Sequence, residues 1–270
     1  MCGLAGVLLG KKRRRKTELE EISGVFTELL LLNQSRGKDA AGLAVVRRDS
    51  SYSLFKRPGP AATLVQDEKY SEIIHRLDNK STCILGHTRL KTRGSEANSL
   101  NNQPIRCKYC LGTHNGHITN ADALFKRYRL PRIAEVDSEI LFRLADTSKN
   151  IDVFLNRLEN AQGAMSAVFT KITSPDTIYI IKGNKPLTLW YHRGYHAVFY
   201  SSEQWPLETV FGDDKSVIPL DIRSFTFVLF DVSSLMNYEL RSIHFKERRE
   251  IAWERFEKNS WGEFLSTVRF

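Results

Sequence analysis

The 270-residue chain lacks the features that mark secreted and membrane proteins. Its four cysteines are too few for a disulfide framework in a chain of this length. No stretch approaches the roughly 18 consecutive apolar residues of a membrane-spanning helix. The apolar start GLAGVLLG precedes the basic run KKRRRK, which is the reverse of the order in a secretory signal. These absences predict a cytoplasmic protein with no membrane partner.

The composition is that of an ordinary globular protein, with 41% hydrophobic and 26% charged residues. The length suits one large domain, with or without an appendage, because single cores stop growing near about 250–300 residues. The net charge is +9, and much of the excess lies in residues 11–16. Such a run can attract phosphate backbones or acidic partners, but it is usually a solvated turn. Because no nucleic-acid-binding motif accompanies it, we expect no nucleic-acid partner.

Short strands between turn signals, together with pairs of helices, predict an α+β sandwich rather than βαβ repeats. Apolar periodicity predicts a buried strand at 3–9 and a helix containing Leu19 to Leu30. Further strands are expected at 42–46, 52–57, 82–87, 109–114, 164–171, 177–182, 187–192, 197–201 and 225–230, and further helices at 68–77, 120–128, 137–146 and 151–160. The polar stretch 90–104 has no apolar period, and loops of this length inside compact domains are often functional.

A domain boundary is expected near residue 235, where the pattern of short strands ends. Residues 1–235 form the expected domain, and residues 236–270 form a basic, aromatic extension. In this extension Ile251, Trp253 and Phe256 are spaced to form the apolar side of a short helix. The extension either caps the core of the protein or docks on a partner.

The first residues combine a nucleophile with its own base. Cys2 follows the initiator methionine, and its small side chain permits removal of Met1. A terminal cysteine then carries a free α-amino group, with a pKa of about 7.7–8.0, beside its thiol. That amine can take the thiol proton directly or through a water molecule. The pattern predicts a nucleophilic Cys2, although any small residue can stand at position 2 by accident.

Three polar stretches contain the other groups that chemistry on an amino-acid amide requires. Asn115-Gly116 offers a side-chain amide and a backbone N–H for a tetrahedral oxyanion. Arg89 can bind an α-carboxylate through two parallel hydrogen bonds, and Asp137 can pair with an α-ammonium. Each has a simpler interpretation. Asn-Gly is a common hairpin turn, Arg89 can belong to a structural ion pair, and Asp137 can cap the helix that follows.

Together with Cys2, these stretches resemble the class II glutamine amidotransferases, the N-terminal-nucleophile glutaminases known from glucosamine-6-phosphate synthase and amidophosphoribosyltransferase. The matching motifs are Cys2-Gly3-Leu4-Ala5-Gly6, Arg36-Gly37-Lys38-Asp39-Ala40-Ala41-Gly42, His87-Thr88-Arg89, His114-Asn115-Gly116-His117-Ile118, and Asp137 in VDSE. In the family the fourth motif reads His-Asn-Gly-x-Ile. The motifs are collinear, and the resemblance covers approximately residues 2–230.

The resemblance implies a four-layer αββα sandwich of two mainly antiparallel sheets, with residues 1–235 as the glutaminase domain and Cys2 at the end of a central strand. It implies that the side-chain amide of L-glutamine is hydrolysed through a Cys2 γ-glutamyl thioester. The ammonia would pass to a separate synthase or ligase. The implied catalytic residues are Cys2, Asn115 and Gly116, and the implied glutamine-binding residues are Arg89, Thr92 and Asp137. Arg36 and Asp39 are implied as a structural pair behind the site, with His87 as a further supporting residue.

The chain also departs from the family pattern. After His-Thr-Arg the glucosamine-6-phosphate synthases continue Trp-Ala-Thr-His-Gly, whereas this loop reads Leu-Lys-Thr-Arg-Gly over residues 90–94, and Ala40 replaces the usual serine. No isomerase or phosphoribosyltransferase domain follows, so a stand-alone module is expected. Two alternatives remain open: a catalytically silent interaction subunit, or an amidase or peptidase with another substrate. No cofactor is expected, since the pair Cys107 and Cys110 falls short of the about four ligands of a zinc site.

Overall fold

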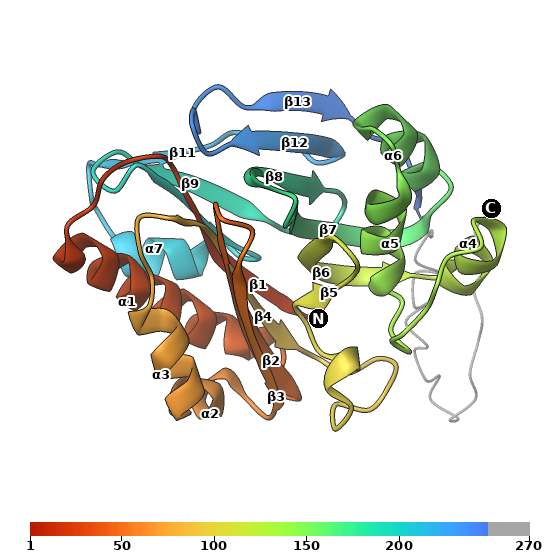
Figure 1. Ribbon diagram of the computed structural model, residues 1–270, viewed down its shortest axis with the longest axis horizontal. Coiled ribbons are helices and arrows are strands. Elements are labelled where there is room, and N and C mark those ends of the chain that lie inside the picture. Colours follow the sequence, from red (N-terminus) through yellow and green to blue (C-terminus); the bar gives the residue numbers. More distant parts are fainter. Residues whose placement is uncertain (248–270) are drawn as a thin grey trace, which may run out of the picture.

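The computed structural model describes residues 1–247 as two stacked β-sheets with helices on both outer faces (Figure 1). Among these residues every strand pairing is antiparallel except the short one between β14 and β7. The expected α+β fold, a four-layer αββα sandwich, is confirmed. The helix expected around Ile251, Trp253 and Phe256 lies outside the described residues.

The first sheet places the N-terminal strand at its centre. Its order is β11-β9-β10-β1-β4-β2-β3. All residues of β1 are buried, because layers cover both faces of the sheet and leave no polar side to the strand. The strands are β1 (Gly3–Leu9), β2 (Ala40–Arg47), β3 (Tyr52–Pro58), β4 (Ser81–Arg89), β9 (Thr188–His192), β10 (Ala197–Ser201) and β11 (Val217–Pro219).

The second sheet has the order β13-β12-β8-β7-β6-β5, and β14 pairs with the start of β7. Its strands are β5 (Ile105–Arg106), β6 (Cys110–Ile118), β7 (Gln162–Lys171), β8 (Ser174–Lys182), β12 (Thr226–Asp231), β13 (Glu239–Ser242) and β14 (Lys246–Glu247). The last two belong to the expected extension, and Ile243 and Phe245 between them are buried in the core. The described part of the extension is therefore built into this sheet, while the boundary at residue 235 stays a prediction.

The helices divide between the two outer faces, as Figure 1 shows. On the first sheet lie α1 (Lys16–Leu32), α2 (Ala61–Val65), α3 (Glu68–His75) and α7 (Trp205–Phe211). On the second sheet lie α4 (Ala121–Arg127), α5 (Glu139–Thr147) and α6 (Ile151–Leu158). Two 3-10 turns, η1 (Asn33–Arg36) and η2 (Ser99–Asn101), lie in the connections. No described helix is long and apolar enough to cross a bilayer.

Three buried clusters hold these layers together. One lies between the two sheets and contains Leu4 and Tyr200. A second joins the first sheet to its helices around Phe26, and a third joins the second sheet to its helices around Phe142 and Phe169. Cys2 directly precedes β1, whose side chains belong to both the first and the second cluster. The nucleophile expected from the sequence is thus attached to a rigid central strand.

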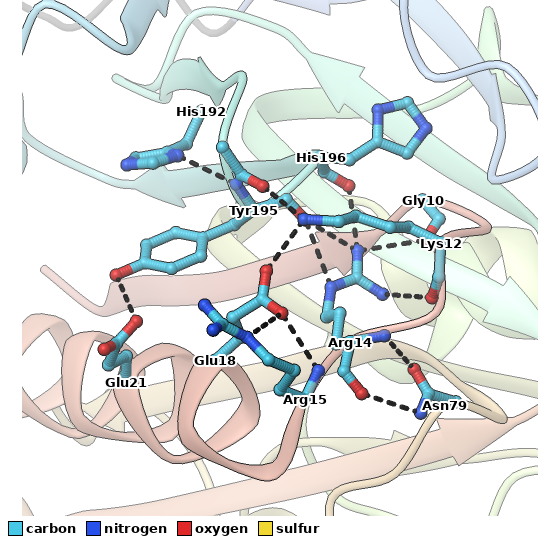
Figure 2. Close-up of polar contacts among 11 residues, drawn as sticks. Gly10, Lys12, Arg14, Arg15, Glu18, Glu21, Asn79, His192, Tyr195 and His196 are labelled. Carbon is cyan, nitrogen blue, oxygen red and sulfur yellow. Dashed lines mark hydrogen bonds and ion pairs between the residues drawn. The ribbon is translucent and has the colours of Figure 1, made fainter.

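The basic run 11–16 is not simply a solvated turn, which corrects the expectation from its charge. Arg14 is only 5% exposed, and burial lowers its pKa to about 10. Lys12 pairs with Glu18 at 2.7 Å. Figure 2 shows that the Arg14 guanidinium ties the start of α1 to the β9–β10 turn. It donates to the carbonyls of Gly10, Tyr195 and His196 at 2.8–3.1 Å.

Candidate active site

Cys2 lies where β1 and β4 of the first sheet meet β6 of the second. Figure 1 shows the N-terminus beside β6. Gly3 pairs with Thr88 on β4, and a Cβ at Gly3 would lie 2.5 Å from the Thr88 hydroxyl and 2.8 Å from the Asn33 carbonyl. Only glycine fits this close approach, which explains why the residue after the cysteine has no side chain. The expected position of Cys2 at the end of a central strand agrees with the structure.

The thiol of Cys2 is partly buried and directed at the start of the 90–104 loop. Its Sγ lies 3.7 Å from the carbonyl oxygen of Leu90. Burial raises the pKa of the thiol, while the Leu90 hydrogen bond, the terminal amine and Arg89 lower it and Asp137 raises it. Arg89 and Asp137, both expected to bind substrate, are therefore close enough to Cys2 to act on it electrostatically.

Asn115 and Gly116 lie inside β6, not at a hairpin turn. The alternative interpretation of Asn-Gly is thus wrong. The Asn115 side chain is 0% exposed, and neither its oxygen nor its nitrogen has a hydrogen-bond partner among residues 1–247. A buried amide without partners costs about 1–3 kcal/mol and calls for an explanation. Gly116 has φ +144°, and a Cβ there would collide with the Ala164 carbonyl, so only glycine fits.

Arg89 ends β4 with its guanidinium buried against the 90–104 loop. Its Nη1 donates to Oδ1 of Asn102 at 2.7 Å, and its Nη2 donates to the carbonyls of Arg93 and Gly94 at 2.5 and 2.8 Å. Within residues 1–247 these are its partners, and none is a carboxylate. The structure therefore does not support the interpretation of Arg89 as one half of a structural ion pair.

The loop occupies the edge of Arg89 that a carboxylate would use. A carboxylate binds arginine bidentately through Nη2 together with either Nε or Nη1. Both geometries need a hydrogen on Nη2, and the two hydrogens there already serve the carbonyls of Arg93 and Gly94. The bidentate clamp expected at Arg89 is available only after residues 93–94 shift.

Polar contacts hold this loop in place from outside. Asp122 on α4 bridges Arg93 and Arg132 at 3.2 and 2.5 Å. Asn101 exchanges two hydrogen bonds with Glu135, through the Glu135 carboxylate and backbone N–H, both at 2.9 Å. Thr92, expected to line the pocket, is instead exposed on the loop. A role for Thr92 in glutamine binding stays a prediction.

Asp137 reaches back to β6 instead of capping the next helix. Helix α5 begins at Glu139, and Ser138 is its N-cap residue. The Asp137 carboxylate is almost fully buried and accepts from the backbone N–H of Ile118 at 2.5 Å. The cap interpretation is therefore wrong for its side chain. Asp137 lies beside Ile118, at the end of β6 that carries the candidate oxyanion donors.

Arg36 and Asp39 do not pair with each other, which corrects that expectation. Arg36 donates from Nε to the Cys2 carbonyl at 2.8 Å, and its guanidinium forms an ion pair with Glu203. Asp39 instead accepts from the backbone N–H of Lys91 at 2.6 Å. One residue therefore supports the nucleophile, and the other supports the loop that covers Arg89.

His87 is fully buried and contacts β6, the strand that carries the candidate oxyanion donors. Its Nε2 lies 3.3 Å from the carbonyl oxygen of His114, directly before Asn115. Burial lowers the pKa of His87 to about 3, so the ring is neutral near pH 7. With a carbonyl as partner, Nε2 carries the hydrogen. His87 thus links β4 of one sheet to β6 of the other at the candidate site.

Comparisons with known proteins show what the chain is similar to. No family profile matches the chain. It is 29% identical over 209 residues to the 7-cyano-7-deazaguanine synthase of Sulfolobus acidocaldarius, covering 75% of this chain and 43% of that protein. It is 27% identical over 207 residues to the glutamine–fructose-6-phosphate aminotransferase of Staphylococcus epidermidis, covering 73% and 32%. The chain thus spans less than half the length of these curated relatives.

Two solved structures share the fold. The glutamine phosphoribosylpyrophosphate amidotransferase of B. subtilis matches with a TM-score of 0.67 at 18% identity, over 89% of this chain and 49% of that one. A structure described as the allosteric regulatory enzyme of purine biosynthesis matches with a TM-score of 0.68 at 19% identity, with the same coverage. The chain resembles the class II glutamine amidotransferases. This amidotransferase-like chain therefore has the same fold as these two solved structures.

Sequence reasoning missed the residues that hold β6, the strand of the candidate oxyanion donors. The side chain of Gln103 accepts from the His114 N–H at 2.6 Å and donates to the His114 carbonyl at 3.1 Å. Ser138 bonds the Nδ1 of the same histidine at 2.8 Å. The only signal for Gln103 was its place at the end of the long polar loop. Ser138 lies beside Asp137 and gave no separate signal.

Cys107 and Cys110 close the tight turn between β5 and β6. The Cys107 N–H donates to the Cys110 carbonyl at 2.8 Å, and both thiols are free and buried. Burial raises the pKa of each thiol, that of Cys107 to about 12. Across residues 1–247 no cluster of three or more potential metal ligands occurs.

Proposed function

We propose that this chain hydrolyses the side-chain amide of L-glutamine, with Cys2 as the nucleophile. The observation that carries the proposal is the Asn115 amide, which is fully buried between the two sheets with neither polar atom partnered. An oxyanion forming at the substrate carbonyl would accept a hydrogen bond from the side-chain N–H of Asn115. The arrangement suits a site that is organised for a transition state before the substrate enters it.

The described contacts support a sequence of steps. With Met1 removed, the Cys2 amine takes the thiol proton and the thiolate attacks the glutamine side-chain carbonyl. Asn115 and the Gly116 N–H stabilise the tetrahedral intermediate. The ammonium returns a proton to the leaving nitrogen, and ammonia departs from a γ-glutamyl thioester. Water then releases glutamate. Met1 is 57% exposed, which makes it accessible to an aminopeptidase.

Substrate recognition is assigned to Arg89 and Asp137. The α-carboxylate would replace the carbonyls of Arg93 and Gly94 on Nη2 of Arg89, so binding and loop movement are coupled. Asp137 would pair with the α-ammonium. A clamp for both charged groups of a free amino acid has no use on a peptide, which favours glutaminase over the amidase or peptidase alternative.

We further propose that the ammonia passes to a separate synthase or ligase. The matched relatives carry two different names, and this chain spans less than half of each. Because enzymes with different names share this segment, the segment alone does not determine which molecule accepts the ammonia. We therefore assign the acceptor reaction to a partner outside the matched segment.

Release of glutamate from L-glutamine by the purified chain tests the proposal. Cys2→Ala should abolish the release, whereas Cys83→Ala, which changes a buried cysteine of β4 outside the site, should preserve it. Nα-acetylglutamine lacks the free ammonium and should not be hydrolysed. Equal hydrolysis of both compounds would support the amidase alternative, and no hydrolysis by protein that lacks Met1 would support the silent subunit.

A further inference from the structure

His117 occupies the position of its motif that the family pattern leaves open, between Gly116 and Ile118 on β6. Its Nδ1 lies 3.3 Å from Oδ2 of Asp137. The backbone N–H of Ile118 donates to the same oxygen at 2.5 Å. The His117 side chain is 49% exposed and that of Asp137 only 5%. The histidine therefore reaches the buried carboxylate from its solvent side.

Two donors on one oxygen restrict the orientation of the Asp137 carboxylate. The terminal torsion of aspartate has a broad minimum, so the carboxylate plane turns easily unless hydrogen bonds fix it. The contacts described for this carboxylate, from Ile118 and His117, both fall on Oδ2. Oδ1 is left to accept from a substrate, because each carboxylate oxygen has its own lone pairs.

The surroundings also keep Asp137 ionised. Burial by itself raises the pKa of this carboxyl group, but the hydrogen bond from His117, the nearby His114 and the N–H of Ile118 together lower it below its usual value. The carboxylate is therefore anionic at neutral pH, as a partner for an ammonium group must be. His117 contributes to this state as well as to the orientation.

We propose that His117 is a positioning residue for glutamine. Its Nδ1–H holds the Asp137 carboxylate in the orientation in which Oδ1 accepts from the substrate α-ammonium. The inference rests on the glutaminase activity proposed above and adds a residue to its binding site. His117 contacts the substrate only through Asp137, so its loss acts on binding and not on the chemical step.

Steady-state glutamine hydrolysis by three variants tests this role. His117→Ala removes the donor and should raise KM about three- to tenfold, with kcat nearly unchanged. The rise is smaller than for loss of a direct hydrogen bond to a charged group, because His117 acts on the substrate only through Asp137. His117→Asn places an amide N–H close to the position of Nδ1 and should restore most of the parent KM. His75→Ala, on the exposed side of α3, is the control and should leave both constants unchanged.

The outcomes separate this inference from the proposed function. Glutamine hydrolysis by the parent with an equal KM in His117→Ala, or with no restoration in His117→Asn, overturns the inference alone. A lower kcat at constant KM also overturns it. No hydrolysis by the parent overturns the proposed function and the inference with it. If His117→Ala does not fold, His117→Gln, which displaces the donor by one methylene, replaces it and should show the same rise in KM.

Discussion

Asn115→Leu should stabilise the protein and remove most of its activity. Leucine has nearly the shape of asparagine but has no polar atoms that burial would leave without partners. The Asn115 side chain is 0% exposed, with both polar atoms unpaired among the described residues. The substitution therefore removes a cost that the folded protein bears and also removes a donor to the oxyanion.

The substitution should raise the free energy of unfolding and lower kcat. One unsatisfied buried polar group costs about 1–3 kcal/mol. We expect a net gain of about 1 kcal/mol in the free energy of unfolding, which raises Tm by about 2–4 °C in a domain of this size. Loss of one oxyanion donor should lower kcat by about 10²–10³-fold.

Thermal unfolding and glutamate release measure the two effects on the same samples. Asn33→Leu is a matched control. Asn33 is also buried, and its Oδ1 also has no partner among the described residues, but its Nδ2 donates to the Leu29 carbonyl and the Ser201 hydroxyl at 2.8 and 2.9 Å. That substitution should lower Tm. A lower Tm with unchanged kcat in Asn115→Leu would show that Asn115 has a structural role and would refute the reasoning.

Three further predictions follow from the contacts described above. Arg89→Lys keeps the charge but loses the planar fork, so kcat/KM for glutamine should fall about tenfold to a hundredfold; an unchanged value would contradict the carboxylate clamp. Arg14→Met leaves the carbonyls of Gly10 and Tyr195 without their guanidinium donor and should cost about 3 kcal/mol in urea unfolding, whereas Arg15→Met, at an 83% exposed side chain, should be nearly neutral. His87 and His114, with pKa values of about 3 and about 4, stay neutral in the fold while the unfolded chain binds protons below about pH 6.5. The two histidines should contribute fully to the free energy of unfolding above that pH. Below it, this contribution should fall by about 1.4 kcal/mol per histidine and pH unit. His87→Leu should therefore reduce the slope of the free energy of unfolding against pH between 6 and 4.5.

The sequence predicted the elements whose burial follows from their own apolar pattern. The strand at 3–9 and the helix containing Leu19 to Leu30 are examples. Every residue of the strand is buried, and the helix buries an apolar residue in each turn. Helix α7 was missed, since its seven residues include Pro206 and show no extended apolar period. Strand β13 was missed because its residues are exposed at the sheet edge and pair only through the backbone.

The burial of Arg14 could not be predicted from its neighbours in the chain. The six consecutive cations of residues 11–16 suggest a solvated run, whereas Arg14 donates to the carbonyls of Tyr195 and His196, more than 180 residues away. The ion-pair partner of Arg36 could not be predicted for the same reason. Its ion pair with Glu203 depends on how β10 ends beside β1, which no local pattern encodes.

The candidate site was predicted in its residue types but not in its geometry. The motifs placed Asn115 and Gly116 together, and the structure adds that the amide is buried without partners. The motifs also predicted that Arg89 binds the α-carboxylate. Its contacts with residues 93–94 could not be predicted, because they depend on the conformation of a polar loop that has no periodic pattern. His117 stood within a quoted motif, and only the fold places it against Asp137.

The central claim is that Cys2, freed of Met1, is the nucleophile of a glutamine site. Mass spectrometry of the protein after treatment with diazo-oxo-norleucine, a glutamine analogue with an electrophilic side chain, tests it most directly. We expect a single adduct on Cys2 in protein that lacks Met1, and we expect it to form much more slowly in Arg89→Lys and Asp137→Asn. Protein that hydrolyses glutamine with Met1 fully retained, or that lacks Met1 and forms no adduct on Cys2, would contradict the account.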